Sequence, residues 1–323
     1  MELGVNCIKS LYTIENTGII TPSVFSLQLR PGFDPSNISE AVDTIEVPTN
    51  AGQGSGSVSG LVACKYGLMA VLEENERKMF IYNQERIDVL EFPLDSPEFS
   101  YANQITFDRH HNIVIAQGDQ NSLLRYNMNG KALPNLELPG HIASLTGVAC
   151  SPEGDLYVSS NDPYTILKQV AGESEWVTLY RGQEDDYDED EDEDDEEREF
   201  DPARFSPGQM SFGNDGELFV ATDNCINVLA ASDGKLKRQI GCDRYRDGEL
   251  CKVEGICATG DGYLFVCDGN YYTHAFTAGG DYLCKFGGND DNPGQLQEPW
   301  AITVDCSGYL LISDSGNGRI QVY

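Results

Sequence analysis

The sequence predicts an all-β fold, a six-bladed β-propeller closed by an N-terminal strand. Three observations support this prediction: an internal repeat of about 45 residues, four strand-like stretches in most copies, and a last copy that stops one strand short. Four strands per repeat of 40 to 50 residues describe a propeller blade, whose faces are buried only by stacking on its neighbours.

The repeat appears in six segments of the sequence that can be superimposed. Each copy has a short apolar strand, a turn containing Gly or Asn, a second strand, a polar turn and a third strand. The copies begin at Gly60, Gln104, Gly147, Gln209, Gly255 and Ala301, and their turn residues are Gly67, Asn112, Gly154, Gly216, Gly262 and Gly308. These turn residues are spaced by 45, 42, 62, 46 and 46, and the long interval contains an acidic insertion. Gly and Asn are the residues expected where the backbone needs a positive φ.

The end of the sequence predicts how the ring closes. The sixth copy supplies only three strands and stops at Tyr323, so its outer strand must come from elsewhere. Residues 43–49, "DTIEVPT", precede the first copy and have strand character, and we expect them to pair with residues 319–323. Two separate open sheets are the alternative, and they would leave long unpaired edges. Residues 1–40 match no copy and are expected to form an N-terminal extended segment before the propeller at 41–323.

The charge of the chain is strongly negative. The formal net charge is −32, of which residues 184–199, "EDDYDEDEDEDDEERE", contribute −13. This composition predicts a disordered acidic insertion at about residues 183–200. It could be a solvating insertion, attract a basic partner, or cover the basic residues Arg244 and Arg246. The remaining negative charge disfavours nucleic acid and anionic membranes. Without a long apolar run or a secretion signal, the chain is expected to be soluble and cytoplasmic.

The ten cysteines do not have the positions of a secreted disulfide framework. Cys64, Cys150 and Cys257 each end an apolar stretch and Cys267 lies inside one, as expected for buried reduced thiols. Cys242 and Cys251 flank a short loop and are the one pair for which a disulfide or a metal is worth testing.

The sixth copy resembles an NHL repeat. Residues 299–323, "PWAITVDCSGYLLISDSGNGRIQVY", have the Pro, the apolar strand, the Gly, the Asp and Asn and the Arg-Ile strand of that repeat. The fifth copy matches through Gly262, Asp268 and Asn270, and the fourth through Gly216, Asp223 and Asn224. The resemblance covers residues 41–323, and it is strong only after about residue 205. It implies an NHL-type propeller similar to the C-terminal propellers of TRIM-NHL ubiquitin ligases.

The resemblance also implies a function. In TRIM-NHL ligases the propeller follows RING, B-box and coiled-coil regions, and this sequence contains none of their zinc spacings or heptads. The chain would then be a non-enzymatic protein-interaction domain that recruits substrate or partner proteins to an attached TRIM-type E3 ubiquitin ligase. The propeller itself is expected to be monomeric.

The expected partner site lies on the face where the loops between the second and third strands emerge together with the blade-joining loops. Tyr and Arg are the residues that most often dominate binding energy at interfaces. The candidate partner-binding residues are Tyr164, Arg244, Tyr245, Arg246, Asn270, Tyr271, Tyr272 and Asn317. Alternatively, the tyrosines pack between blades, and Asn270 and Asn317 serve their turns as Asp268, Asp314 and Arg319 would.

Two other functions remain open. Several TRIM-NHL propellers bind RNA through a basic face, but here the only basic cluster is Lys235, Lys237, Arg238, Arg244 and Arg246. A metal-dependent lactonase or lyase would need ligands where the inner strands begin. Those positions hold Ser59, Asn103, Thr146, Gly208, Glu254 and Trp300, with one carboxylate among them. The sequence therefore predicts no catalytic residues, no metal and no cofactor.

Overall fold

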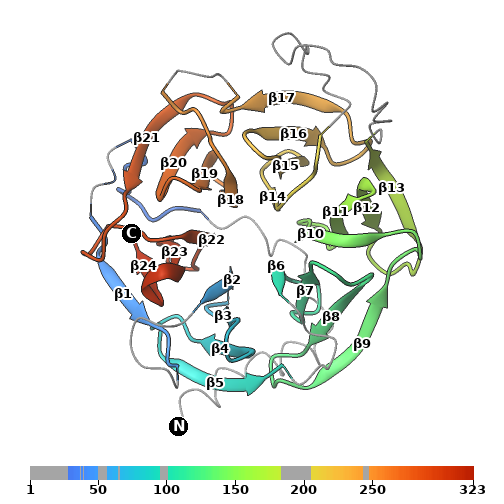
Figure 1. The fold of residues 1–323 in the computed structure, drawn as a ribbon, viewed down its shortest axis with the longest axis horizontal. Helices are drawn as coiled ribbons and strands as arrows, with labels where there is room; N and C mark the ends of the chain where they lie inside the picture. The colour runs from blue at the N-terminus through green and yellow to red at the C-terminus, as the bar shows by residue number, and fades with distance from the viewer. Residues whose placement is uncertain are drawn as a thin grey trace, which may run out of the picture.

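A computed structural model describes residues 28–36, 38, 40–49, 57–64, 66–94, 101–182, 205–242 and 247–323. In these residues the protein is all-β, with six four-stranded antiparallel sheets around a central channel (Figure 1). The described part contains one short 3₁₀ helix, η1 (Ser315–Asn317). The predicted six-bladed propeller is thus confirmed, whereas the acidic insertion and residues 1–27 lie outside the described residues.

Five blades are built from four consecutive strands, which we call a to d from the channel outward. Blade 1 is β2 (Val58–Ala63), β3 (Met69–Glu73), β4 (Lys78–Tyr82) and β5 (Asp88–Pro93). Blade 2 is β6 (Ala102–Phe107), β7 (Ile113–Gln117), β8 (Ser122–Tyr126) and β9 (Ala132–Glu137). Blade 3 is β10 (Ala143–Cys150), β11 (Leu156–Asp162), β12 (Tyr164–Gln169) and β13 (Trp176–Arg181).

Blades 4 and 5 follow the same order. Blade 4 is β14 (Met210–Phe212), β15 (Glu217–Ala221), β16 (Ile226–Ala230) and β17 (Leu236–Ile240). Blade 5 is β18 (Val253–Ala258), β19 (Tyr263–Asp268), β20 (Tyr272–Thr277) and β21 (Tyr282–Gly287). Strand β14 has only three residues, so the inner edge of blade 4 is short.

Blade 6 joins the two ends of the ring. It contains β22 (Pro299–Val304), β23 (Leu310–Asp314), β24 (Arg319–Val322) and, as its outer strand, β1 (Asp43–Glu46). The antiparallel register sets Ile45 opposite Ile320, and Figure 1 shows β1 beside β24. Because Ile45 is 7% exposed and Ile320 is fully buried, the closing strand contributes to the core. The predicted closure by an N-terminal strand is confirmed.

The core consists of apolar layers between neighbouring blades. Strand β3 illustrates the pattern, since all five of its residues are buried. Ala70 and Leu72 pack against blade 2, while Met69 and Val71 pack against blade 6. Successive residues of a strand point to opposite faces, so a strand between two blades has to be apolar on both. This arrangement accounts for the continuous apolar runs in the repeats.

The turns between strands a and b correct one residue of the sequence prediction. All five turn glycines have positive φ, including Gly154 at 92°. In blade 2, however, the left-handed residue is His111, with φ 59°, and not Asn112. His111 donates its backbone N–H to Asp108 O, as Gly154 does to Ser151 O. The sequence prediction therefore placed the turn residue of repeat 2 one position too late.

The described part of the N-terminal segment lies against blade 6. Arg30 donates its backbone N–H to Gly308 O at 2.9 Å, and its guanidinium lies 4.2 Å from the centre of the Tyr309 ring. Leu29 is buried in the apolar layer between blades 5 and 6. No helix in the described part of the chain is long and apolar enough to cross a membrane.

Candidate interaction face and central channel

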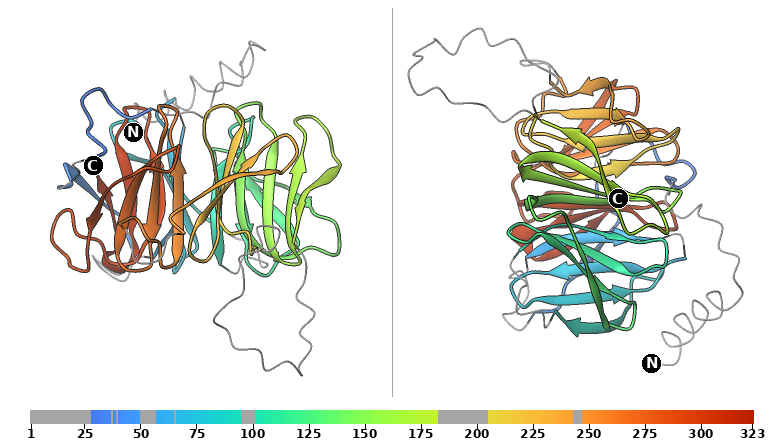
Figure 2. Two further views of the ribbon diagram at one scale, coloured as in Figure 1. Left: turned by 90° about the horizontal axis from the view of Figure 1, so that it is seen from above. Right: turned by 90° about the vertical axis from the view of Figure 1, so that its right-hand side faces the viewer.

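One end of the propeller gathers the b–c turns and the blade-joining loops, and we call it the loop face. Figure 2 shows the ring from the side, with turns at both ends of the sheets. The loop face comprises residues 57, 74–77, 101, 118–121, 138–142, 163, 205–209, 222–225, 241–242, 247–252, 269–271, 288–298 and 315–318. Backbone hydrogen bonds connect its two kinds of loop, as from Gly118 N–H to Tyr101 O and from Gly269 N–H to Lys252 O. The predicted common face of these loops is present.

A ring of buried polar side chains supports the loop face from below. Each lies within two residues of the end of strand b. In order of blades they are Glu73, Gln117, Ser160, Thr222, Asp268 and Asp314. In three blades the carboxylate accepts the backbone N–H of the loop that enters the same blade: Ser57 to Glu73 at 3.0 Å, Cys251 to Asp268 at 3.0 Å and Gln297 to Asp314 at 2.6 Å. These acids therefore fix loop positions.

Asp314 is at the centre of the largest of these networks. It is fully buried and accepts a hydrogen bond from Arg319 Nε at 2.7 Å. The Asn317 amide donates to both Asp314 oxygens at 3.0 Å and to Asp290 O at 3.2 Å. The amide nitrogen of Asn317, a candidate for partner contact, is thus bound by Asp314 and by the loop that leads into blade 6. Its half-buried side chain holds η1 in place.

The candidate residues of blade 5 lie next to each other at the turn between β19 and β20. Asn270 is exposed, and its backbone N–H is held by Asp268 Oδ1 at 2.6 Å. Tyr271 has φ 71°, a conformation rare for a bulky residue, and is half-buried. Tyr272 is half-buried as well, with the Lys285 ammonium 4.6 Å from its ring centre. The turn thus presents two aromatic rings and an amide at the loop face.

Tyr164 is the corresponding aromatic residue of blade 3. It begins β12, is half-buried, and accepts the Gly182 N–H on its backbone oxygen at 2.8 Å. One blade, blade 4, separates it from Tyr271 and Tyr272 around the ring. Arg244, Tyr245 and Arg246 lie outside the described residues, so their predicted part in the site stays a prediction.

Sequence reasoning missed Tyr101. This residue precedes β6 on the loop face and is 48% exposed, one of the few large exposed apolar side chains in the described chain. Its ring covers Gly118, where an added Cβ would collide with the ring atoms. The available signal was a glycine in the b–c turn opposite an aromatic residue in the preceding loop. It could not be interpreted without the pairing of the two loops.

The predicted basic cluster is largely neutralised within blade 4. Arg238 forms a bidentate pair with Glu217, at 2.8 Å from Nη1 to Oε1 and 2.6 Å from Nη2 to Oε2. Lys237 also reaches Glu217 at 3.2 Å, and Lys235 pairs with Asp233 at 2.8 Å. The Arg238 guanidinium lowers the pKa of Glu217 below its ordinary value. Three of the five basic residues therefore have acidic partners nearby.

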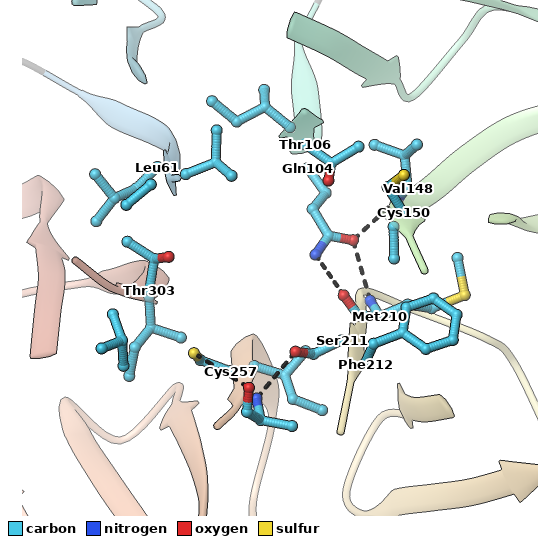
Figure 3. Close-up of a pocket in the computed structure, with 18 residues that line it drawn as sticks. Leu61, Gln104, Thr106, Val148, Cys150, Met210, Ser211, Phe212, Cys257 and Thr303 are labelled. Carbon is cyan, nitrogen blue, oxygen red and sulfur yellow. Dashed lines mark hydrogen bonds between the residues drawn. The ribbon is translucent and has the colours of Figure 1, made fainter. Parts of the chain in front are cut away.

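The central channel contains a cavity of about 110 Å³ lined by strands a of all six blades (Figure 3). Its polar side chains include Gln104, Thr106, Ser211 and Thr303, and its lining has no carboxylate or histidine. Gln104 donates to Met210 O at 2.7 Å and accepts the N–H groups of Met210 and Val148 at 3.0 Å each. Its side chain thereby connects blades 2, 3 and 4 across the channel wall.

Three of the six positions that a metal enzyme would use at the channel mouth make other contacts. Asn103 donates its amide to Leu145 O at 2.6 Å, and Thr146 bonds to Pro207 O. Glu254, the one carboxylate, is 2.6 Å from Lys252. In the described chain no three His, Cys, Asp or Glu side chains are arranged to hold a metal ion.

None of the nine described cysteines, Cys242 and Cys251 included, forms a disulfide bond. Cys64, Cys150 and Cys267 are buried as predicted, whereas Cys257 is only half-buried because it lines the channel cavity. Desolvation raises the pKa of Cys257 and of Cys267 to about 12 each, so these thiols stay protonated. Cys225 differs from them, because hydrogen bonds lower its pKa.

Comparison with known sequences supports the resemblance at the end of the chain. Residues 296–323 match the family model of the NHL repeat. E3 ubiquitin-protein ligase TRIM71 of Xenopus tropicalis is 41% identical over 39 residues, which are 12% of this chain and 5% of the ligase. The same ligase of Gallus gallus is 44% identical over 39 residues, 12% of this chain and 4% of the ligase. The matches thus span a very small part of these ligases.

Comparison with solved structures supports the fold. A streptogramin B lyase has a TM-score of 0.59 at 16% identity, with 87% of this chain and 86% of the lyase covered. An auxiliary nutrient binding protein from Bacteroides thetaiotaomicron has a TM-score of 0.62 at 12% identity, with 93% and 75% covered. At such identities the likeness concerns the fold alone. The chain is a six-bladed β-propeller whose last blade matches the NHL repeat, and a stretch of 39 residues is similar in sequence to TRIM71.

Proposed function

We propose that this propeller is a non-enzymatic, cytoplasmic protein-interaction domain that recruits a substrate or partner protein to an attached TRIM-type ubiquitin ligase. The observation that carries the proposal is that acidic and aromatic side chains have different roles on the loop face. Its acids are used to hold loops, as Asp268 and Asp314 are, while the tyrosines beside them stay partly exposed. Aromatic rings on a rigid base are suited to anchor a protein partner.

The proposed contact surface contains Tyr101, Tyr164, Asn270, Tyr271 and Tyr272. The backbone beneath the three blade 5 residues is fixed, because Asp268 holds Asn270 N–H and Tyr271 N–H bonds to Asp268 O. A preorganised surface loses little conformational entropy on binding. Arg244, Tyr245 and Arg246 complete the proposed surface on sequence grounds alone.

RNA binding is the second candidate, and the charge of the chain argues against it. The net charge is −32, and the described basic residues of the predicted cluster pair with Glu217 and Asp233. Binding to RNA would lack its main electrostatic contribution, because these cationic side chains are already paired with acids. The fold of the streptogramin B lyase suggests a lyase function as a further alternative. The lining of the channel cavity, however, contains no ionisable side chain other than cysteine that could serve as a ligand or a base.

The experiment is a selection of displayed peptides on the purified chain, followed by affinity measurements with a Tyr271→Ala and Tyr272→Ala double variant. We expect at least a tenfold loss of affinity for the selected sequences. Tyr263→Ala is the control, because Tyr263 is a half-buried tyrosine at the opposite end of β19. Thermal melting of both variants verifies that the fold is retained.

Two results would overturn the proposal. One is unchanged peptide affinity in the double variant. The other is nanomolar RNA affinity in a filter-binding titration, with the steep salt dependence of phosphate neutralisation. For recruitment to a ligase, the full-length protein should ubiquitinate a substrate fused to a selected peptide, and the double variant should not.

A further inference from the structure

Two cysteines at the loop-face end of blade 4 form a polar cluster that the interaction function does not use. Cys225 directly precedes β16, and Cys242 lies two residues after the end of β17. The antiparallel register sets Ile226 opposite Ile240, so the two cysteines come from adjacent chain segments. Their thiols hydrogen-bond each other.

Polar groups surround the sulfur of Cys225. The Thr222 hydroxyl lies 3.2 Å from Cys225 Sγ, and the Gln239 amide donates to the same sulfur at 3.9 Å. The hydrogen bond from Cys242, followed by that from Thr222, lowers the pKa of Cys225 to about 7, although burial opposes the shift. Donors aimed at a sulfur stabilise its thiolate form.

The two thiols differ in their access to solvent. Cys225 is 1% exposed, whereas Cys242 is exposed. A small oxidant in solution therefore meets Cys242 first, and Cys225 is positioned to react with the product. At Cys267, beside the Thr273 hydroxyl, and at the half-buried Cys257, desolvation is the largest effect and raises the pKa instead.

Asn227 gives a second observation on the same cluster. It is fully buried, its Oδ1 accepts from Gln239 Nε2 at 2.8 Å and lies 3.9 Å from Cys225 Sγ. Its amide nitrogen has no hydrogen-bond partner among the described residues. A buried amide nitrogen without a partner is costly, and the atom of Asn227 that faces Cys225 is its oxygen, which accepts from the thiol.

We propose that Cys225 and Cys242 are an oxidation site that forms an intramolecular disulfide when hydrogen peroxide reaches the exposed Cys242. Cys242 attacks one peroxide oxygen as its proton passes to the neighbouring Cys225 thiolate; an S–O bond forms, the O–O bond breaks, and the leaving hydroxide takes that proton from Cys225 to become water. The Cys225 thiolate then attacks Cys242 Sγ, the S–S bond forms, and the S–O bond breaks with loss of a second water. Two thiols and one peroxide give one disulfide and two waters, and two electrons pass from sulfur to oxygen.

The test treats the purified full chain with one equivalent of hydrogen peroxide at neutral pH and then blocks the remaining thiols. Digestion without reductant and mass spectrometry should show the Cys225 and Cys242 peptides joined, and a reductant should separate them. Cys251→Ser is the matched control, because Cys251 is the other exposed cysteine nearby in the sequence, and this change should leave the yield of the cross-link unaltered.

Variants of the two partners separate the steps. Cys225→Ser should stop the reaction at a sulfenic acid on Cys242, which dimedone traps. Because Cys225 is buried, the exposed Cys242→Ser is the second variant, and in it Cys225 should resist peroxide altogether. A disulfide between Cys242 and Cys251, or overoxidation of Cys242 without any cross-link in the wild type, would overturn the proposal.

Discussion

The side chain of Gln104 in β6 satisfies both backbone polar groups of Met210 in β14, although the two strands belong to blades 2 and 4. The same Gln104 oxygen accepts the N–H of Val148 in the blade between them. Strand β14 is only three residues long, and this amide supplies hydrogen bonds at the inner edge of blade 4 that no neighbouring strand provides. One side chain thus ties three blades together at the channel.

We predict that Gln104→Ala lowers the free energy of unfolding by about 1–3 kcal/mol, because it leaves two N–H groups and one carbonyl without their partner. Urea denaturation measures the loss. Gln169→Ala is the control, since the Gln169 amide makes one long bond to Ser174 O, at 3.3 Å, on the outer part of blade 3. Equal stability of the two variants would contradict a role of Gln104 in joining the blades.

Closure of the ring gives a second prediction. Ile45→Ala should destabilise the protein by about 2–4 kcal/mol, because Ile45 of β1 is buried against β24. Val42→Ala changes a 56% exposed neighbour and should cost no more than about 0.5 kcal/mol. Equilibrium denaturation of both variants is the measurement. A small effect of Ile45→Ala would mean that the closing strand does not support the ring.

The buried Asp314 should be among the most sensitive positions of blade 6. Asp314→Asn removes the charge that pairs with Arg319 and leaves a mostly buried guanidinium without its partner. We expect a loss of about 3 kcal/mol in the free energy of unfolding. The exposed Asp291→Asn is the control and should be neutral. If Asp314→Asn behaves like this control, the carboxylate does not hold the loop at Gln297.

The pair of Glu217 and Arg238 predicts a dependence on pH. Arg238 lowers the pKa of Glu217 in the folded state, so its contribution to stability is present above the ordinary pKa of a glutamate. It is lost as the pH falls through the lowered pKa. Glu217→Gln should therefore cost about 1 kcal/mol at neutral pH and progressively less in acid. Melting temperatures across this range, with Asp233→Asn as the exposed control, provide the measurement.

The sequence predicted the fold well because propeller blades repeat. Strand count, the missing last strand and its replacement by residues 43–46 all follow from six copies in register. The turn of blade 2 was misassigned because it contains no glycine, and the choice between His111 and Asn112 depends on the hydrogen bond to Asp108. Periodicity alone locates such a turn only to within a residue.

The candidate site was less accessible to sequence reasoning, since it depends on pairings between distant segments. Asn317 looked available for a partner, yet its amide is bound by Asp314. Cys242 was matched with Cys251 because they are close in the chain, whereas the strand pairing of blade 4 brings Cys225 to it. The tyrosines of blade 5 could be selected as candidates from the sequence, because aromatic residues in an exposed turn indicate a binding surface without knowledge of any other segment.

The pairing of β1 with β24 also dictates an order of events during synthesis. On the ribosome, residues 319–322 emerge some 270 positions after residues 43–46, their hydrogen-bonding partners. At translation rates of about 5–20 residues per second, the apolar side of blade 1 that faces blade 6 stays exposed for on the order of tens of seconds before blade 6 is synthesised. During that interval the nascent chain exposes an apolar surface of the kind that chaperones bind.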